Sequence, residues 1–430
     1  MHFPKIIERH ADEAGFLWDQ RRRAAVSPVF DLASFALLDL RVDANLEGLV
    51  VAGEHGLRAA MEALERRSRA ARAGRPDDGA ELFPAIFTAA EIGDTMALAK
   101  LLVRAGQHPR GEEALISALG FLSPATATRV LADLVADECP PVLRRLGIAG
   151  FSARRAVSSS GADSGAWLPK ALASDDDSVR SRAFRAVGEI GRRDLAGSLR
   201  AEVRSRGDEA DPWALWSLAL FGEESAAAPL FRVAESDSPA APHAAALAAI
   251  LSPRSESVTR LLALGDSQVV HRWRAALAGM EALGDPVFLP WLVGTIESRP
   301  ETSRRAAWVY SSITGVLLEP PLAIRTSSEE PSDEALAWRR TDPFEDLPTP
   351  QPEAIRDHFH RIEKTFTPGE RRLAGKVMDS TVLREILKTG LQPSRAVAAL
   401  ELARTAATTS LFPVQAPAFL QKAHLATAAP

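Results

Sequence analysis

Cysteine, tyrosine and lysine are scarce in this chain of 430 residues. Its one cysteine, Cys139, excludes an intrachain disulfide and is consistent with a reducing cytosol. With one tyrosine, and no alternating run of Val, Ile or Tyr long enough for a strand, the sequence disfavours β-sheet. Seven lysines leave the basic charge almost entirely to arginine. These scarcities favour an all-α protein without disulfides.

Long apolar segments are missing too. No window approaches about eighteen apolar residues without a charge, so no membrane span is expected. Residues 1–10 lack the uninterrupted apolar core of a secretory signal. The formal net charge of −5 argues against broad binding to nucleic acid or anionic membranes. We therefore expect a cytoplasmic protein with no membrane partner.

Motifs that carry chemistry are absent as well. The chain contains no Gly-rich phosphate loop, no Cys-x-x-Cys, no His-Glu-x-x-His and no Gly-x-Ser-x-Gly. His358 and His360 would lie about 200° apart on a helix and cannot share one metal. His10 and Glu13 have a workable spacing for two ligands but no obvious third. We expect no catalytic residue, no metal site, no cofactor and an inert thiol at Cys139.

A repeating helical pattern is what the sequence does contain. Glycine, or an equivalent, recurs about every thirty residues, which is the length of two short helices and two turns. The best-preserved unit is 174–194, where Asp176 or Asp177 is placed to cap a helix, an explanation simpler than a cation site. Asp266 is expected to repeat that cap. The expected helix stops are Gly53, Gly93, Gly120, Gly150, Gly188, Gly222, about Leu251, Gly284 and Gly315.

Residues 177–191 carry the pattern Asp-x-Val-Arg-x-x-Ala-x-x-x-Val-Gly-x-Ile-Gly. This pattern resembles the second helix of a HEAT repeat. In that family the second helices line a concave face that commonly binds protein segments. The resemblance implies an all-α fold, an α-solenoid of about seven to eight HEAT-like helical pairs with a C-terminal helical extension.

Both ends of the chain carry a narrower resemblance. Residues 10–21 show His-x-x-Glu-Ala-x-Phe-Leu-Trp-x-x-Arg, and residues 38–49 show Leu-Asp-x-Arg-Val-x-Ala-x-Leu-x-Gly-Leu. Residues 390–403 show Gly-x-Gln-x-x-Arg-x-x-Ala-Ala-Leu-Glu-Leu-Ala. These stretches resemble an uncharacterised proteobacterial family of HEAT-like proteins, often encoded near type VI secretion genes. The resemblance, poor across 320–350, implies a protein partner that is a component or cargo of the secretion system.

Composition divides the chain into four expected regions. They are an N-terminal helical cap (1–80), HEAT-like repeats (81–318), a Pro-rich and acidic linker or loop (319–351), and a C-terminal helical region with an extended tail (352–430). Trp338 and Phe344 are the side chains that could pin the loop to a repeat surface.

Helices are also expected within the last region. The patterns predict them at 352–364, 367–374 and 381–404. The tail from Thr408 lacks a helical period. Leu411 and Phe412 are expected to dock as part of an extended strap.

A row of Arg and Trp residues on the expected second helices is the candidate partner-binding groove. Both residue types are enriched among interface hot spots. The alternative is that the tryptophans form the core between repeats and the arginines form a solvated face. The candidate residues are Arg182, Arg185, Trp213, Trp216, His271, Arg272, Arg304, Arg305 and Trp308.

Two functional classes follow from these observations. The first is a non-catalytic scaffold or adaptor that binds a segment of a partner protein. The second is a HEAT-like enzyme or ligand-handling protein, by analogy with bilin lyases and repeat-fold DNA glycosylases. The second class needs a buried acidic residue or reactive centre that the sequence does not identify. Nucleic acid is not an expected partner, and salt-dependent retention on DNA would reveal one.

Overall fold

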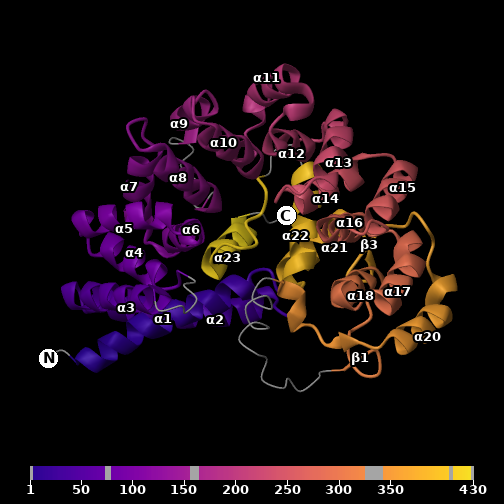
Figure 1. Ribbon diagram of the computed structural model, residues 1–430, viewed down its shortest axis with the longest axis horizontal. Coiled ribbons are helices and arrows are strands. Elements are labelled where there is room, and N and C mark those ends of the chain that lie inside the picture. The colour runs from indigo at the N-terminus through magenta and orange to yellow at the C-terminus, as the bar shows by residue number, and fades with distance from the viewer. Residues whose placement is uncertain (1–2, 73–78, 155–163, 325–341, 406–409, 428–430) are drawn as a thin grey trace. The chain divides into compact units, whose positions relative to one another are not determined.

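The computed structural model describes residues 3–72, 79–154, 164–324, 342–405 and 410–427 (Figure 1). Regular structure in these ranges is almost entirely helical, so the protein is all-α, as the sequence predicts. No described helix is both long and apolar enough to cross a membrane. The chain forms two compact units: the first holds Met1–Ala25, Leu32–Ala186 and Phe412–Pro430, and the second holds Val26–Asp31 and Val187–Leu411.

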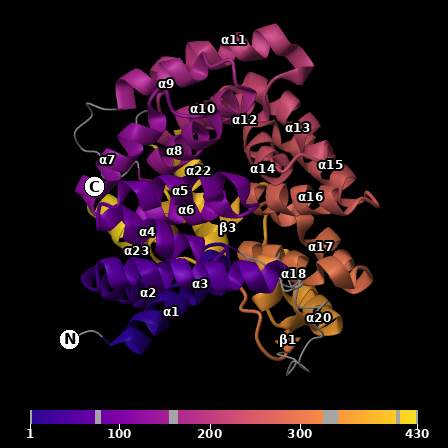
Figure 2. The same cartoon turned by 60° about the vertical axis from the view of Figure 1, so that its left-hand side comes forward.

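Consecutive helices build the first unit. They are α1 (Pro4–Ala24), α2 (Leu32–Val51), α3 (Glu54–Arg72), α4 (Leu82–Glu91), α5 (Thr95–Gln107), α6 (Gly111–Phe121), α7 (Pro124–Val135), α8 (Pro141–Arg154), α9 (Ser164–Leu172) and α23 (Ala418–Thr427); α10 (Asp177–Ile190) contains the boundary between the units. α1, α2 and α3 pack against one another (Figure 2). α4, α6 and α8 contact one another in that order, and α23 returns to α2.

A buried arginine joins three parts of the first unit. The Nε of Arg21 donates to Oδ1 of Asp39 at 2.6 Å, and both side chains are almost completely buried. Oδ2 of Asp39 accepts the backbone N–H of Ala418 at the start of α23. The guanidinium also lies over the rings of Phe35 and Phe121, 4.6 and 5.2 Å from their centroids. This network fixes the last helix to the first two.

The second unit continues the helical order and adds four very short strands. Its α-helices are α11 (Ala196–Arg206), α12 (Pro212–Leu220), α13 (Ala227–Glu235), α14 (Ala241–Leu251), α15 (Arg254–Gly265), α16 (Val270–Leu283), α17 (Leu289–Ser298), α18 (Pro300–Thr314), α20 (Pro352–Ile362), α21 (Ser380–Thr389) and α22 (Gln392–Thr405). Its 3₁₀ turns are η1 (Arg193–Leu195), η2 (Gly207–Glu209), η3 (Glu224–Ala226), η4 (Pro286–Phe288), η5 (Pro343–Asp346) and η6 (Glu363–Thr365). Its strands are β1 (Ala323–Ile324), β2 (Thr349–Pro350), β3 (Arg372–Leu373) and β4 (Lys376–Val377), paired β1 with β2 and β3 with β4, both antiparallel.

Helix pairs organise the second unit. α13 packs on α14, α15 on α16 and α17 on α18, while α14, α16 and α18 also contact one another in that order. α14 is rich in alanine, and a Cβ added at Gly279 of α16 would lie close to the carbonyl oxygen of Ala245. Small side chains therefore let α14 and α16 approach closely.

Only some of the expected glycine stops end helices. Gly53, Gly93, Gly222, Gly284 and Gly315 follow helices and have positive φ, and Leu251 is the last residue of α14. The other three, Gly120, Gly150 and Gly188, were predicted wrongly, because they lie inside α6, α8 and α10. A Cβ added at Gly150 would overlap the side chain of Leu119, and a Cβ added at Gly188 would overlap Ser217. These glycines serve close packing, and a neighbouring glycine, Gly191, ends α10.

The two expected caps have different outcomes. Oδ1 of Asp176 accepts the backbone N–H groups of Ser178 and Val179, both at 3.0 Å, which confirms it as the cap of α10. Asp266 does not cap α16. Its Oδ1 instead accepts the indole N–H of Trp291 at 2.9 Å.

Two expectations for the C-terminal region are wrong. Residues 367–374 contain no helix, and a β3–β4 hairpin turns at Ala374 and Gly375, both with positive φ. The N–H of Arg372 donates to the carbonyl of Gly284 at 2.8 Å, so the hairpin is fixed by the end of α16. In the tail, where no helical period is found in the sequence, residues 418–427 form α23. Leu411 and Phe412 precede it outside regular structure, as expected: Phe412 is buried, and the N–H of Leu411 donates to the carbonyl of Glu189 at 3.0 Å.

Candidate functional site

Three of the candidate residues lie on α18 (Pro300–Thr314), which Gly315 caps at its C-terminus. Trp308 follows Arg305 by three residues and Arg304 by four, so each arginine lies beside it on the helix surface. Trp308 is buried, and its indole N–H donates to Oε1 of Glu281 on α16 at 2.7 Å. The site thus begins at the contact between α16 and α18.

Phe344 of η5 packs on this face. Cζ of Arg305 lies 4.5 Å from the centroid of the Phe344 ring, within the range of a cation–π contact. The ring centroid of Trp308 lies 6.3 Å from that of Phe344. Phe344 is 5% exposed. The expectation that Phe344 pins part of the loop to a helical surface is confirmed, whereas Trp338 lies outside the described residues.

Polar contacts hold the chain on either side of Phe344. Oδ1 of Asp342 accepts the N–H of Phe344 at 3.0 Å, and Oδ2 of Asp346 accepts the hydroxyl of Ser27 at 2.8 Å. Beyond them, the Nη2 of Arg304 donates to Oγ1 of Thr349 at 2.9 Å. We refer to residues 342–347 as the acidic–aromatic segment.

Buried charges shape the electrostatics of the site. Burial raises the pKa of Glu281, although the hydrogen bond from Trp308 and the charge of Arg305 oppose the shift. Burial lowers the pKa of Arg305, while Asp342 and Glu281 raise it and Arg274 lowers it further. The guanidinium of Arg305 is therefore near two carboxyl groups, one on α16 and one on the acidic–aromatic segment. An additional carboxylate would be attracted by Arg274, which is exposed.

The other candidate residues occur in separate places. Trp213 and Trp216 on α12 meet edge to face at 5.6 Å, and Trp216 is buried. His271 and Arg272 are half-buried in the first turn of α16, where Nε of Arg272 donates to the carbonyl of Glu235. The half-buried Arg182 and Arg185 belong to the first unit, whereas the other seven belong to the second.

The side chains considered for metal binding or catalysis have other contacts. Nδ1 of His10 is 2.9 Å from Oδ1 of Asn45, and Nδ1 of His358 is 2.8 Å from the hydroxyl of Tyr310. Burial raises the pKa of the Cys139 thiol, which disfavours the reactive thiolate. Among the described residues, no three or more His, Cys, Asp or Glu side chains are grouped to hold a metal ion.

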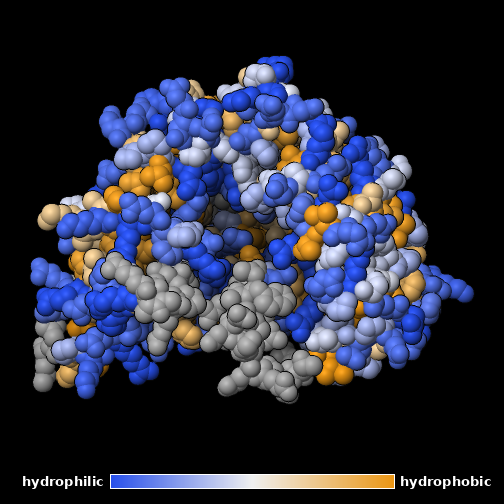
Figure 3. Space-filling model, in the orientation of Figure 1, coloured by the Kyte–Doolittle hydropathy of each residue, from blue (hydrophilic) through white to orange (hydrophobic). Residues whose placement is uncertain are grey.

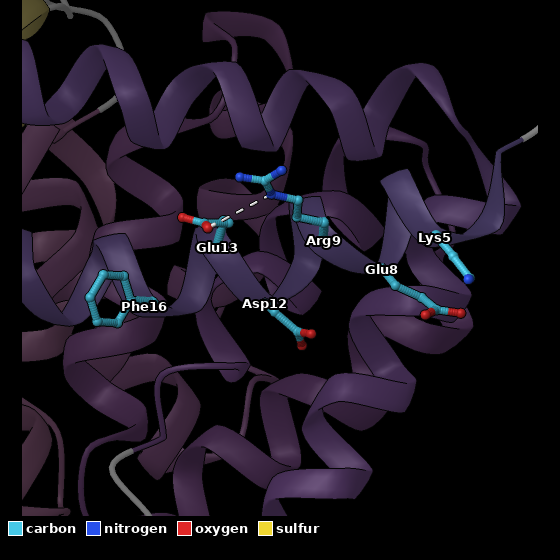
Figure 4. A pocket seen from close by; sticks show the side chains of 6 residues that line it. All are labelled: Lys5, Glu8, Arg9, Asp12, Glu13 and Phe16. Carbon is cyan, nitrogen blue, oxygen red and sulfur yellow. Dashed lines mark ion pairs between the residues drawn. The ribbon is translucent and has the colours of Figure 1, made fainter.

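A surface pocket of about 430 Å³ lies along α1 (Figure 4). All its lining residues come from that one helix, and most are exposed: Lys5, Glu8, Arg9, Asp12, Glu13 and Phe16. The Nε of Arg9 lies 3.9 Å from Oε1 of Glu13, and the Nη2 of Arg66 on α3 donates a hydrogen bond to Oδ1 of Asp12. A pocket lined by one helix cannot enclose a ligand, and we do not assign it a function.

Hydrophobic side chains on the surface drawn in Figure 3 form small patches among hydrophilic ones. Such scattered exposure is ordinary and does not mark a site. The α16–α18 face is different, because charged and aromatic groups from distant parts of the chain converge on it.

Sequence reasoning missed Arg274 and Glu281 as members of this site. Arg274 lies on the same helix as the proposed His271 and Arg272, so helical spacing was a usable signal for it. Glu281 gave no signal, because nothing in the sequence shows that its carboxyl is buried beside Trp308.

Comparison with known proteins adds no assignment, because neither a family model nor a curated protein sequence matches the chain.

Proposed function

We propose that the protein is a non-catalytic scaffold that binds a segment of a partner protein. Its helical pairs would form an α-solenoid of the HEAT type, with α14, α16 and α18 as second helices. The ordered contacts among these three helices support this arrangement. The α16–α18 face would then be one part of the partner-binding surface.

A single observation carries the proposal. The α16–α18 face already holds a stretch of polypeptide that contains no α-helix, the acidic–aromatic segment with its 3₁₀ turn η5, through Phe344 and its flanking polar contacts. Arg and Trp supply planar donors and large apolar area, which suits recognition of a peptide. The same groups could hold a segment of another protein.

Affinity purification of the tagged full-length chain from its native host tests this function. The variant Arg274→Glu reverses an exposed charge near the site, and Arg232→Glu on α13 is the matched control, since its partner Asp208 is exposed. We expect a specific protein partner, recovered at least tenfold less with the first variant and normally with the control. Recovery of no specific protein, or equal losses in both variants, contradicts the proposal.

The sequence resemblance makes components and cargo of the type VI secretion system the first partners to examine. Purification from a strain that expresses the system, compared with one lacking it, would test that association. If the same partner is recovered equally from both strains, the scaffold function does not depend on the secretion system.

The enzymatic alternative has one observation in its favour, the buried carboxyl of Glu281. A raised pKa would let this group act as a proton donor. The Oε1 of Glu281 accepts a hydrogen bond from the indole N–H of Trp308, and the Trp308 ring packs near Phe344. The acidic–aromatic segment would therefore have to move before a substrate could reach the carboxyl. Partner capture that survives Glu281→Gln favours the scaffold.

A further inference from the structure

The acidic–aromatic segment has the sequence Asp-Pro-Phe-Glu-Asp-Leu. Two of its side chains, Phe344 and Leu347, are buried, while Asp346 is exposed apart from its bond to Ser27. The side chain of Asp342 caps the turn through the N–H of Phe344. The segment therefore presents one aromatic ring toward α18 with carboxylates on both sides.

The receiving face is complementary to this pattern. Arg305 lies over the ring, and the charge of Asp342 acts on the same guanidinium. Arg304 binds Thr349 just after the segment, and Arg274 adds a positive charge at the surface. An aromatic side chain between carboxylates is the chemistry that these arginines and Trp308 recognise.

Two buried side chains and two side-chain hydrogen bonds hold the segment. Among the described residues, the strand that follows it is β2, which pairs with β1, Ala323 with Pro350 and Ile324 with Thr349. Because the segment is part of the same chain, even weak contacts keep it bound at a high effective concentration. A peptide of similar chemistry from another protein must compete with it.

We propose, on the basis of the scaffold function above, that the α16–α18 face binds partner segments in which an aromatic residue is flanked by carboxylates. The acidic–aromatic segment is the chain's own occupant of that site. A partner of this kind binds by displacing it.

A synthetic fluorescent peptide corresponding to residues 342–350 tests the proposal by anisotropy with the full-length chain. In the variant Phe344→Ala the chain's own ring is removed while the receiving face is intact. We expect this variant to bind the peptide at least tenfold more tightly than the wild type. A peptide with alanine in place of phenylalanine should not bind, and raising the salt concentration should weaken binding.

Two controls separate displacement from damage. Unchanged hydrogen exchange in α16 and α18 shows that Phe344→Ala leaves the receiving face folded. The double variant Asp342→Ala, Asp346→Ala keeps the ring but removes the cap and the bond to Ser27, and should bind the peptide with intermediate affinity. Adding Arg274→Glu to Phe344→Ala should weaken peptide binding about tenfold.

The proposal is overturned if the wild type and Phe344→Ala bind the peptide equally well. It is also overturned if the peptide binds with the same affinity when its phenylalanine is replaced by alanine. An absence of binding to the folded variant overturns it as well. If a native partner is recovered but the peptide does not compete with it, this inference fails and the scaffold function stands. If the peptide binds but no native partner is found, the site stands and the scaffold function fails.

Discussion

Arg21 in the first unit and Arg305 in the second each lie over a phenylalanine ring, and residues distant in sequence complete both arrangements. Arg21 in the first unit is ion-paired with Asp39 at 2.6 Å, and Asp39 also accepts the N–H of Ala418. Arg305 in the second unit has no ion pair among the described residues and is covered by Phe344. The first arrangement is a buried network around one ion pair, whereas the second combines an aromatic ring with hydrogen bonds on either side of it.

The difference has a physical consequence. A buried ion pair with every oxygen bonded is costly to break, because removing either member leaves a charge without compensation. A ring over a guanidinium can be exchanged for another ring, since the same contacts re-form. We therefore expect a structural role for the Arg21 network, whereas the Arg305 face is where we propose that a partner binds.

Arg21→Met should produce the largest effect. It leaves Asp39 buried and without its cation, and we expect a loss of about 3–5 kcal/mol in the free energy of unfolding. Urea denaturation measures the loss, and hydrogen exchange should locate it in α1, α2 and α23. The control Arg66→Met removes an exposed pair with Asp12 and should cost less than about 1 kcal/mol. Similar losses of stability in Arg21→Met and Arg66→Met would show that the buried Arg21 network stabilises the fold no more than an exposed ion pair does.

Phe344→Ala should have a smaller effect, confined to the second unit. The buried ring is lost, with an expected cost of about 1.5–3 kcal/mol. Hydrogen exchange should accelerate in residues 342–351 and stay unchanged in α1 and α2. The control Phe16→Ala removes a ring that is 57% exposed and should change stability little. Unfolding of the whole second unit by Phe344→Ala would show that the acidic–aromatic segment is core.

Glu281→Gln tests the buried carboxyl through pH. Because the folded-state pKa is raised, the carboxyl contributes stability below the unfolded pKa of about 4.3 and loses it as pH rises through the folded value. Glutamine resembles the neutral carboxyl and still accepts from Trp308. We expect the variant to be more stable than the wild type at pH 7, with the gap closing toward pH 4.

Thermal unfolding at a series of pH values measures that gap. Glu297→Gln, which loses an ion pair with the half-exposed Arg356, is the control and should show no such pH trend. A gap that is constant with pH would show that the pKa of Glu281 is the same in the folded and unfolded protein.

Thr349→Val should have the smallest effect. The substitution keeps the shape but removes the hydroxyl that accepts from Arg304. Because Arg304 is half-exposed, water replaces part of the bond, and we expect a loss of about 0.5 kcal/mol. Thermal unfolding measures it, and peptide binding by the Phe344→Ala variant should change little when Thr349→Val is added. A loss comparable to that of Phe344→Ala would place the main anchor of the segment at Thr349.

Local patterns in the sequence predicted the all-α fold and the cap at Asp176, because both depend on residues close together in the chain. The same patterns misplaced helix stops at Gly120, Gly150 and Gly188. A glycine that ends a helix and one that lets two helices approach look alike in sequence. Only a neighbour such as Leu119 distinguishes them.

The candidate site was partly predictable. Arg304, Arg305 and Trp308 were chosen from helical spacing, and the structure brings Phe344 to them. Glu281 on α16 could not be predicted, because Trp308, which donates to its carboxyl, lies on a different helix, α18. A helix was predicted at residues 367–374, whereas a hairpin forms at residues 372–377, because contacts with Gly284 and Ser312, distant in sequence, decide its form.

By itself, the sequence determined that this protein is helical, through its composition and its period of about thirty residues. Tertiary structure alone decided that Arg21 forms a buried ion pair with Asp39 and that Arg305 lies against the ring of Phe344. The physical reason is that helix formation depends on neighbouring residues, whereas the environment of a charge depends on burial and on partners far along the chain.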